Sequence, residues 1–251
     1  MKAQRGQSPT AAPGPGHGIA GVAAPARPAT RPVAPAASPP LRPPQAEAIL
    51  EAAAKAFADR GFPGASMAEL ARACGVSKAL LYHYYTNKEE ILFDMTERYM
   101  TRLVALCVDI EARQLPAREQ LAALIRAFLS EYQTSQYKHM VLTHDFKFLD
   151  PARRRIITGK QRAVVGTFRR ALAATSAGSL SAEAALPAAM LVFGMINWTF
   201  TWLKPGGAMS YAEFAEWVIR MLEGGIGNLG RPVAAPAAAR TVAARASGRR
   251  A

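Results

Sequence analysis

Apolar residues between positions 45 and 228 recur at intervals of three and four, which is the spacing of one face of an α-helix. The first such stretch covers 45–60, and Gly61 follows it as the type of residue that commonly ends a helix. No stretch shows the alternation of apolar and polar residues that is typical of a strand. The pattern therefore predicts an all-α protein of about nine helices.

Capping signals set the boundaries of these helices. A serine is followed three residues later by a glutamate at Ser66 and again at Ser210, so that each side chain can bond a free backbone N–H of the first turn. Ser77 and Asn87 are expected to cap the helices that follow them, and Asp150 precedes a proline suited to a first helical turn. The spacing predicts short helices after Ser66 and Ser77.

The two short helices are separated by residues 74–76, which contain a glycine, so the pattern predicts a helix-turn-helix. On the second helix, Leu81, Tyr84 and Tyr85 are expected to pack inward. The opposite face is compact enough to enter the major groove of double-stranded DNA. The candidate DNA-binding residues are Ser66, Ser77, Lys78, Ala79, Leu80, Tyr82, His83 and Lys88.

Each side chain of that face offers a different contact. Lys78 can meet a phosphate or a guanine edge, and Tyr82 can donate to a phosphate. His83 either reaches a base edge or phosphate or remains idle and exposed, and Leu80 either contacts a thymine methyl or packs. Lys88 lies in the first turn of the next helix, where free N–H groups also favour a phosphate.

The stretch 184–203 contains 20 residues without a formal charge, which is long enough to span a bilayer. Polar residues and the interruptions Pro187 and Gly194 argue against a span, so no membrane is expected as a partner. The alternative is a helix buried on all sides, which a second copy of the chain can supply. We therefore expect a homodimer with a four-helix interface formed by this stretch and the helix after Ser210.

Charge changes this picture little. The 251-residue chain has a net charge of +13, but residues 1–46 and 230–251 carry five basic residues each and no acidic one. The segment 1–44, which contains 11 of the 18 prolines, and the segment 230–251 are expected to be disordered tails. The N-terminal tail is either an extension without a binding role or a basic arm that attracts a polyanion. No signal-peptide pattern is present, so a cytoplasmic protein is expected.

Catalytic motifs give no competing interpretation. The sequence shows no phosphate-binding loop, nucleophile elbow, pair of catalytic carboxylates or metal-ligand spacing, so no enzyme, cofactor or metal is expected. His139 and His144 are five apart and do not share a helix face. A DNA-binding protein without any ligand remains a further alternative, although the aromatic- and Met-rich C-terminal region argues against it.

The segment SMAELARACGVSKALLYHYYTNKEEIL, residues 66–92, resembles the DNA-binding domain of TetR-type transcriptional regulators. One departure is Leu80, where that family often has threonine. The resemblance implies a homodimeric repressor of a palindromic operator. It also implies a helix-turn-helix domain at 45–92 and a ligand-binding and dimerisation domain at 93–229, whose effector changes the spacing of the two recognition helices.

The segment FGMINWTFTWLKPGGAMS, residues 193–210, resembles the branch of that family that senses acyl-CoA thioesters. An aromatic wall with a few polar groups suits a lipophilic ligand with a polar head, although the same aromatics could be dimer-core packing. The basic run 153–155 with Lys160 and Arg162 could meet CoA phosphates or form a solvated face. A drug or another small molecule that controls an efflux or catabolic operon is the alternative effector. The candidate ligand-binding residues are Phe146, Met190, Phe193, Asn197, Trp198 and Trp202.

Overall fold

The computed structural model describes residues 44–176, 180–181, 183–204 and 206–225, and within these residues every regular element is a helix. The helices are, in order, α1 (Pro44–Gly64), α2 (Met67–Ala73), α3 (Lys78–Tyr84), α4 (Lys88–Ala112), α5 (Ala117–Thr134), α6 (Gln136–His144), the 3-10 turn η1 (Phe146–Phe148), α7 (Pro151–Thr175), α8 (Ala185–Ile196), α9 (Thr199–Trp202) and α10 (Tyr211–Gly225). The predicted all-α fold is confirmed. The predicted tails lie outside the described residues, apart from Pro44.

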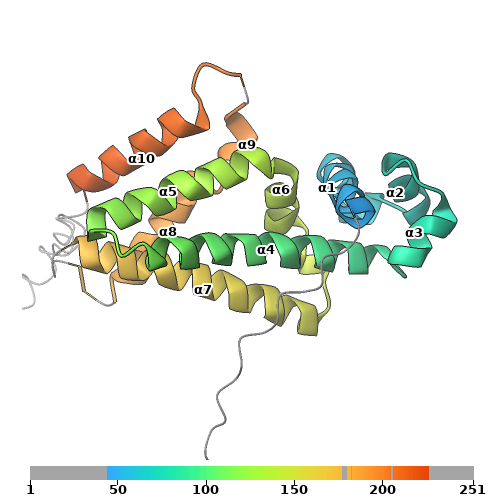
Figure 1. Ribbon diagram of the computed structural model, residues 1–251, viewed down its shortest axis with the longest axis horizontal. Helices are drawn as coiled ribbons and strands as arrows, with labels where there is room; N and C mark the ends of the chain where they lie inside the picture. The colour runs from blue at the N-terminus through green and yellow to red at the C-terminus, as the bar shows by residue number, and fades with distance from the viewer. Residues whose placement is uncertain (1–43, 177–179, 182, 205, 226–251) are drawn as a thin grey trace, which may run out of the picture. The chain divides into compact units, whose positions relative to one another are not determined.

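The long helix α4 connects two groups of helices. Its first turns follow α3 and pack against α1, whereas the rest of its length packs along α7 and α5 (Figure 1). Helix α6 packs on both α1 and α4, so it contacts both groups. Helices α8 and α10 cover α7 and α5 respectively.

The predicted caps explain why the helices begin where they do. The capping box after Ser66 is complete, because Glu69 N donates to Ser66 Oγ and Ser66 N donates to Glu69 Oε2. Ser77 Oγ accepts from the backbone N–H of Leu80 and so begins α3. Between these two helices Gly75 has a φ of 65°, a left-handed conformation that glycine adopts without strain. Local chemistry therefore fixes the helix-turn-helix.

The predicted helix 184–203 is divided in two. Helix α8 ends at Ile196, and the short α9 begins at Thr199. The window Ala185–Trp202 meets the length and composition of a membrane span, with a mean hydropathy of 1.2, and it is the one described stretch that does so; 44% of it is buried inside the protein. The expectation of a single helix was wrong, because the chain turns at Asn197 and Trp198.

Candidate nucleic-acid interface and ligand cavity

Helix α3 has the two faces that its sequence predicts. Leu81 and Tyr85 are 0% and 1% exposed, while Tyr84 is only partly buried. Lys78 and Tyr82 are exposed on the other side, where the Lys78 ammonium lies 5.8 Å from the centre of the Tyr82 ring. Ala79 and His83 are exposed beside them, and Leu80 is half-buried at the edge.

Lys88 does not belong to that exposed face. Its ammonium donates to the backbone carbonyls of Phe62, Ala65 and Pro63 at 2.8, 3.0 and 3.3 Å. It also lies 4.5 Å from the centre of the Phe62 ring. The predicted phosphate contact of Lys88 is therefore corrected, because its donors already satisfy carbonyls at the end of α1.

The hydroxyl of Ser66 also makes its hydrogen bonds within the protein. Its Oγ donates to Glu69 Oε2 at 2.8 Å and accepts from Glu69 N at 3.3 Å. Ser77 Oγ accepts from Leu80 N at 3.1 Å, which uses a lone pair and leaves the side chain exposed at the start of α3. The outward group that the structure brings together is thus centred on Lys78, Ala79, Tyr82 and His83.

A cavity of about 340 Å³ lies among α4, α5, α6, α7 and α8. Four of the six predicted ligand-binding residues line it: Phe146, Met190, Phe193 and Asn197. Aromatic and aliphatic side chains supply the other walls, among them Phe128, Leu103 and Val164. No lysine, arginine, aspartate or glutamate occurs among the described residues that line it.

Trp198 and Trp202 lie outside this cavity, in contrast to the prediction. Trp198 is 50% exposed and packs near His144 and Phe200. Trp202 is 51% exposed and stands edge-on to Phe214 of α10, with ring centres 5.0 Å apart. The helical period accounts for the difference, since Trp198 and Trp202 follow Asn197 by one and five residues and so leave the face that lines the cavity.

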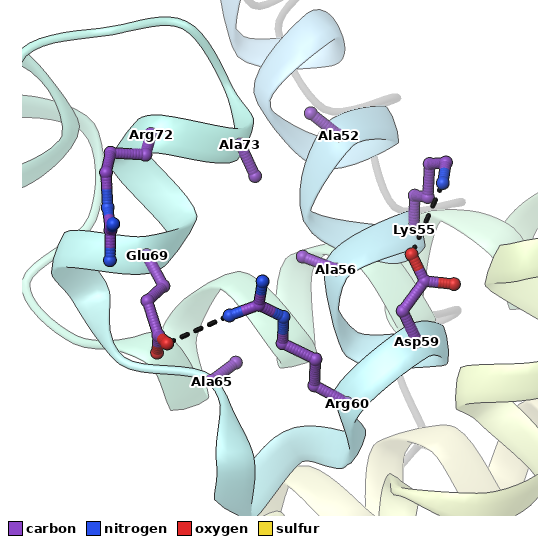
Figure 2. Close-up of a pocket in the computed structure, with 9 residues that line it drawn as sticks. All are labelled: Ala52, Lys55, Ala56, Asp59, Arg60, Ala65, Glu69, Arg72 and Ala73. Atoms are coloured by element: carbon purple, nitrogen blue, oxygen red, sulfur yellow. Dashed lines mark hydrogen bonds and ion pairs between the residues drawn. The ribbon is translucent and has the colours of Figure 1, made fainter.

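A second hollow, of about 410 Å³, lies between α1 and α2 (Figure 2). Its charged residues already pair with one another: Lys55 Nζ lies 3.2 Å from Asp59 Oδ2, and Arg60 Nη1 lies 2.9 Å from Glu69 Oε1. Both pairs are partly exposed and contribute little to stability. We assign no ligand to this hollow.

Two family profiles match separate parts of the chain. Residues 49–95 match the profile of bacterial regulatory proteins of the tetR family, and residues 114–226 match the tetracyclin repressor-like C-terminal domain. A TetR-family transcriptional regulator from Bordetella parapertussis 12822 is 31% identical, with a TM-score of 0.69 over 77% of this chain and 100% of that one. The chain belongs to the TetR family.

Two further relatives of this TetR-family protein carry names that indicate ligands or roles. AibR, solved in complex with isovaleryl coenzyme A and operator DNA, is 27% identical, with a TM-score of 0.63 over 70% of this chain and 97% of AibR. The transcriptional activator FasR of Mycolicibacterium smegmatis is 30% identical over 100 residues. That match spans 39% of this chain and only 45% of FasR.

The cavity also has a polar end that the sequence did not identify. His139 lines it, and its ring stacks on Tyr132 with centres 3.9 Å apart and an interplanar angle of 22°. His139 Nε2 lies 2.8 Å from the carbonyl oxygen of Asn197, and Tyr132 Oη donates to Asn197 Oδ1 at 2.9 Å. Burial lowers the pKa of His139 to about 4, so the imidazole is neutral near pH 7.

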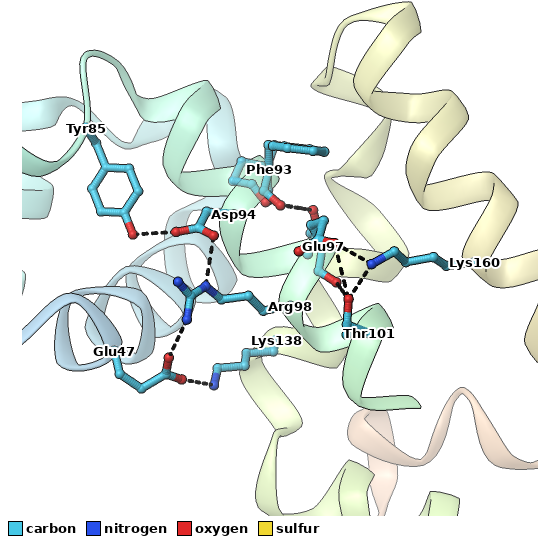
Figure 3. Close-up of polar contacts among 11 residues, drawn as sticks. Glu47, Tyr85, Phe93, Asp94, Glu97, Arg98, Thr101, Lys138 and Lys160 are labelled. Atoms are coloured by element: carbon cyan, nitrogen blue, oxygen red, sulfur yellow. Dashed lines mark hydrogen bonds and ion pairs between the residues drawn. The ribbon is translucent and has the colours of Figure 1, made fainter. Parts of the chain in front are cut away.

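A chain of polar contacts runs from the end of α3 to α6 (Figure 3). Tyr85 Oη donates to Asp94 Oδ2 at 2.8 Å, and Arg98 Nε donates to Asp94 Oδ1 at 2.8 Å. Arg98 Nη1 also reaches Glu47 Oε2 of α1 at 3.4 Å, and Lys138 Nζ reaches Glu47 Oε1 at 3.2 Å. Because Lys138 precedes His139, the contacts link the end of α3 to the cavity wall.

The five basic residues of α7 that the sequence suggested as phosphate contacts fall into two groups. Arg153 Nη1 lies 3.7 Å from Glu89 Oε1, and the Lys160 ammonium pairs with Glu97 (Figure 3), so both are engaged with α4. The other group lines an open hollow of about 410 Å³ and consists of Arg154, Arg155 and Arg162. Of these five residues, the second group retains the arrangement needed to meet an anion from solvent.

Proposed function

We propose that this protein is a ligand-responsive transcriptional repressor that binds a palindromic operator as a homodimer and is released by an acyl-CoA thioester. The observation that carries the proposal is the combination, in one chain, of an exposed recognition face on α3 and an apolar cavity of about 340 Å³. The protein acts in the cytoplasm, needs no cofactor and catalyses no reaction. Its DNA-binding domain is 45–92, and its effector and dimerisation domain is 93–229.

The DNA-binding step uses the outward face of α3. Lys78 and Tyr82 are exposed on the same side, and small Ala79 between them allows the helix to approach the groove closely. Lys78 meets a phosphate or a guanine edge, while the Tyr82 hydroxyl donates to a phosphate. The segment 45–92 has five basic and six acidic residues, so affinity depends on where these side chains lie rather than on bulk charge.

The dimer step uses apolar side chains that the single chain leaves exposed. Those on α8 and α10 are Leu186, Met190, Leu191, Trp217 and Met221, which are 45–66% exposed. Large apolar side chains that a single chain leaves exposed on its helices are typical of a protein–protein interface. Pairing of α8 and α10 with their copies forms a four-helix bundle, and the two-fold symmetry of that dimer suits a palindromic operator.

The effector step uses two neighbouring surfaces of α7. Gln161 and Val165 line the apolar cavity, whereas Arg162, within one turn of both, lines the basic hollow together with Thr158. An acyl group in the cavity would leave the phosphates of coenzyme A near Arg162 and its neighbours. The AibR complex with isovaleryl coenzyme A supports this ligand class by relationship alone.

Release follows from coupling between the two sites. Ligand in the cavity contacts α6 through His139, and Lys138 on the same helix bonds Glu47, which leads through Arg98 to the end of the recognition helix. The effector must bind the conformation that holds the two α3 helices at the wrong spacing more tightly than the DNA-bound one. By linkage, operator DNA then weakens the effector by the same factor.

The test is operator binding by fluorescence anisotropy, with the site first located by selection from genomic fragments. One palindromic site should emerge, and a panel of acyl-CoA thioesters should contain compounds that release it. Release by drug-like cations alone would favour the alternative effector class, and salt-sensitive binding without a preferred site would favour a constitutive DNA-binding protein.

Two variants test the recognition face itself. Lys78→Ala and Tyr82→Phe should each weaken operator binding by roughly tenfold, because each removes a contact worth about 1–2 kcal/mol. Lys55→Ala is the matched control, since Lys55 pairs with Asp59 on α1. The dimer should stay intact in all three, and unchanged operator affinity in both test variants would show that the face is wrongly assigned.

A further inference from the structure

Two buried polar atoms have no hydrogen-bond partner among the described residues, and one of them belongs to a residue that lines the cavity. They are Nδ1 of His139 and Oη of Tyr99. Both residues are 3% exposed, and Tyr99 stands edge-on to the His139 ring with centres 6.1 Å apart. Buried polar groups are nearly always paired, so an unpaired atom on the lining residue His139, with a second on the tyrosine against its ring, indicates where a ligand makes its polar contact.

The hydrogen-bond chemistry of these atoms follows from their neighbours. Asn197 contributes a carbonyl oxygen, which can only accept, so His139 Nε2 must carry the proton and donate to it. In a neutral imidazole Nδ1 is then a bare lone pair that needs a donor. Burial also raises the pKa of Tyr99 well above its ordinary value, so its hydroxyl stays protonated and can donate or accept.

These two atoms define a chemical preference. A carboxylate can only accept, and it would face the Nδ1 lone pair in a cavity whose described lining has no cation. A hydroxyl or an amide can both donate to Nδ1 and accept from the Tyr99 hydroxyl. Stacking on Tyr132 and the bond to Asn197 fix the ring, so His139 cannot readily turn Nδ1 toward another partner.

We propose that the His139–Tyr99 end of the cavity is a subsite for an uncharged hydrogen-bond-donating group, a hydroxyl or an amide, and that it rejects carboxylates. The proposal rests on the cavity being the effector site and specifies which effectors enter it. Free fatty or aromatic acids are excluded at neutral pH. Alcohols, amides and acyl thioesters that carry such a group are accepted.

The experiment compares three octyl compounds of equal chain length by titration calorimetry near neutral pH: octan-1-ol, octanamide and octanoate. The alcohol and the amide should bind at least about tenfold more tightly than the acid, because one hydrogen bond is gained and one unpaired charge avoided. Octanoate binding as tightly as octan-1-ol, or no binding by any of the three, overturns the proposal.

Variants identify the atoms responsible. His139→Gln keeps an N–H for the Asn197 carbonyl but lacks Nδ1, and Tyr99→Phe removes only an unpaired hydroxyl, so both should fold. Each should reduce the preference for octan-1-ol over octanoate to about threefold or less. Tyr137→Phe removes an exposed hydroxyl from α6 and should leave all three affinities unchanged. An undiminished preference in both test variants overturns the proposal.

Measuring whether octanoyl-CoA releases operator DNA distinguishes failure of this proposal from failure of the proposed function. If octanoyl-CoA releases the operator while octanoate binds as tightly as octan-1-ol, the subsite is wrong and the effector class stands. If the octyl preference and its loss in the variants are found but no thioester releases DNA, the subsite stands and the effector class is wrong.

Discussion

Acidification should destabilise this protein through His139, well above the pH at which most carboxylates titrate. Burial lowers the pKa of His139 from 6.5 to about 4. An unfolded chain therefore takes up a proton on this residue below pH 6.5, while the folded chain keeps the imidazole neutral until about pH 4. Across that window the unfolded state binds more protons, so the free energy of unfolding falls as the pH falls.

The size of the effect follows from the two pKa values. Their difference lowers the free energy of unfolding by about 3 kcal/mol over the whole window and by about 2 kcal/mol between pH 7.5 and pH 5. The groups that face the ring from neighbouring helices are Tyr99 and Tyr132, whose pKa values are both raised by burial and which stay neutral throughout this window. The charge of His144 lowers the pKa of His139 further.

Urea denaturation followed by circular dichroism, at one protein concentration and at several pH values between 7.5 and 5, measures this loss. His139→Gln is the comparison, because glutamine does not titrate and every other ionisable group is retained. The difference in unfolding free energy between the two proteins should shrink by about 2 kcal/mol over that range. Equal pH dependence in both proteins would refute a neutral buried His139.

Three further variants test other contacts. Leu191→Glu should give a monomer by light scattering, whereas Val108→Glu, at an equally exposed position on α4, should leave a dimer; two dimers would remove α8 from the interface. Tyr85→Phe keeps the buried ring but loses the bond to Asp94, so the effector should change operator affinity by a smaller factor; an unaltered factor argues against this route. Lys88→Met should lower stability by about 1–3 kcal/mol with little change in the salt dependence of DNA binding, and a weaker salt dependence would restore Lys88 as a phosphate contact.

Features that depend on neighbouring residues could be predicted from the sequence. The caps at Ser66, Ser77 and Asp150 act within three residues, so their pattern is sufficient to locate the helix starts. The inward position of Leu81 and Tyr85 follows from the helical period.

Features that depend on distant residues could not be predicted in this way. Lys88 looked like a phosphate ligand because its carbonyl partners lie 23–26 residues earlier in the chain. Nothing in the sequence indicated that His139 lines the cavity as a fixed neutral tautomer, because Asn197, whose carbonyl fixes that tautomer, lies 58 residues away. The turn at Asn197 and Trp198 interrupts a stretch whose composition is helical throughout, so the end of α8 at Ile196 carries no local signal.

The placement of the tryptophans also gives the protein a built-in spectroscopic reporter. All three lie at the C-terminal end of the sequence, and Trp198, Trp202 and Trp217 are each about half exposed. The segment 45–92 contains none, so ultraviolet emission excited at the indole band arises only outside the helix-turn-helix. Trp198 lies 6.1 Å from the His144 ring, on the segment that follows Asn197 of the cavity wall. Quenching or a shift of the emission wavelength on adding a compound therefore reports binding at the cavity or at the exposed faces of α9 and α10, without any attached dye.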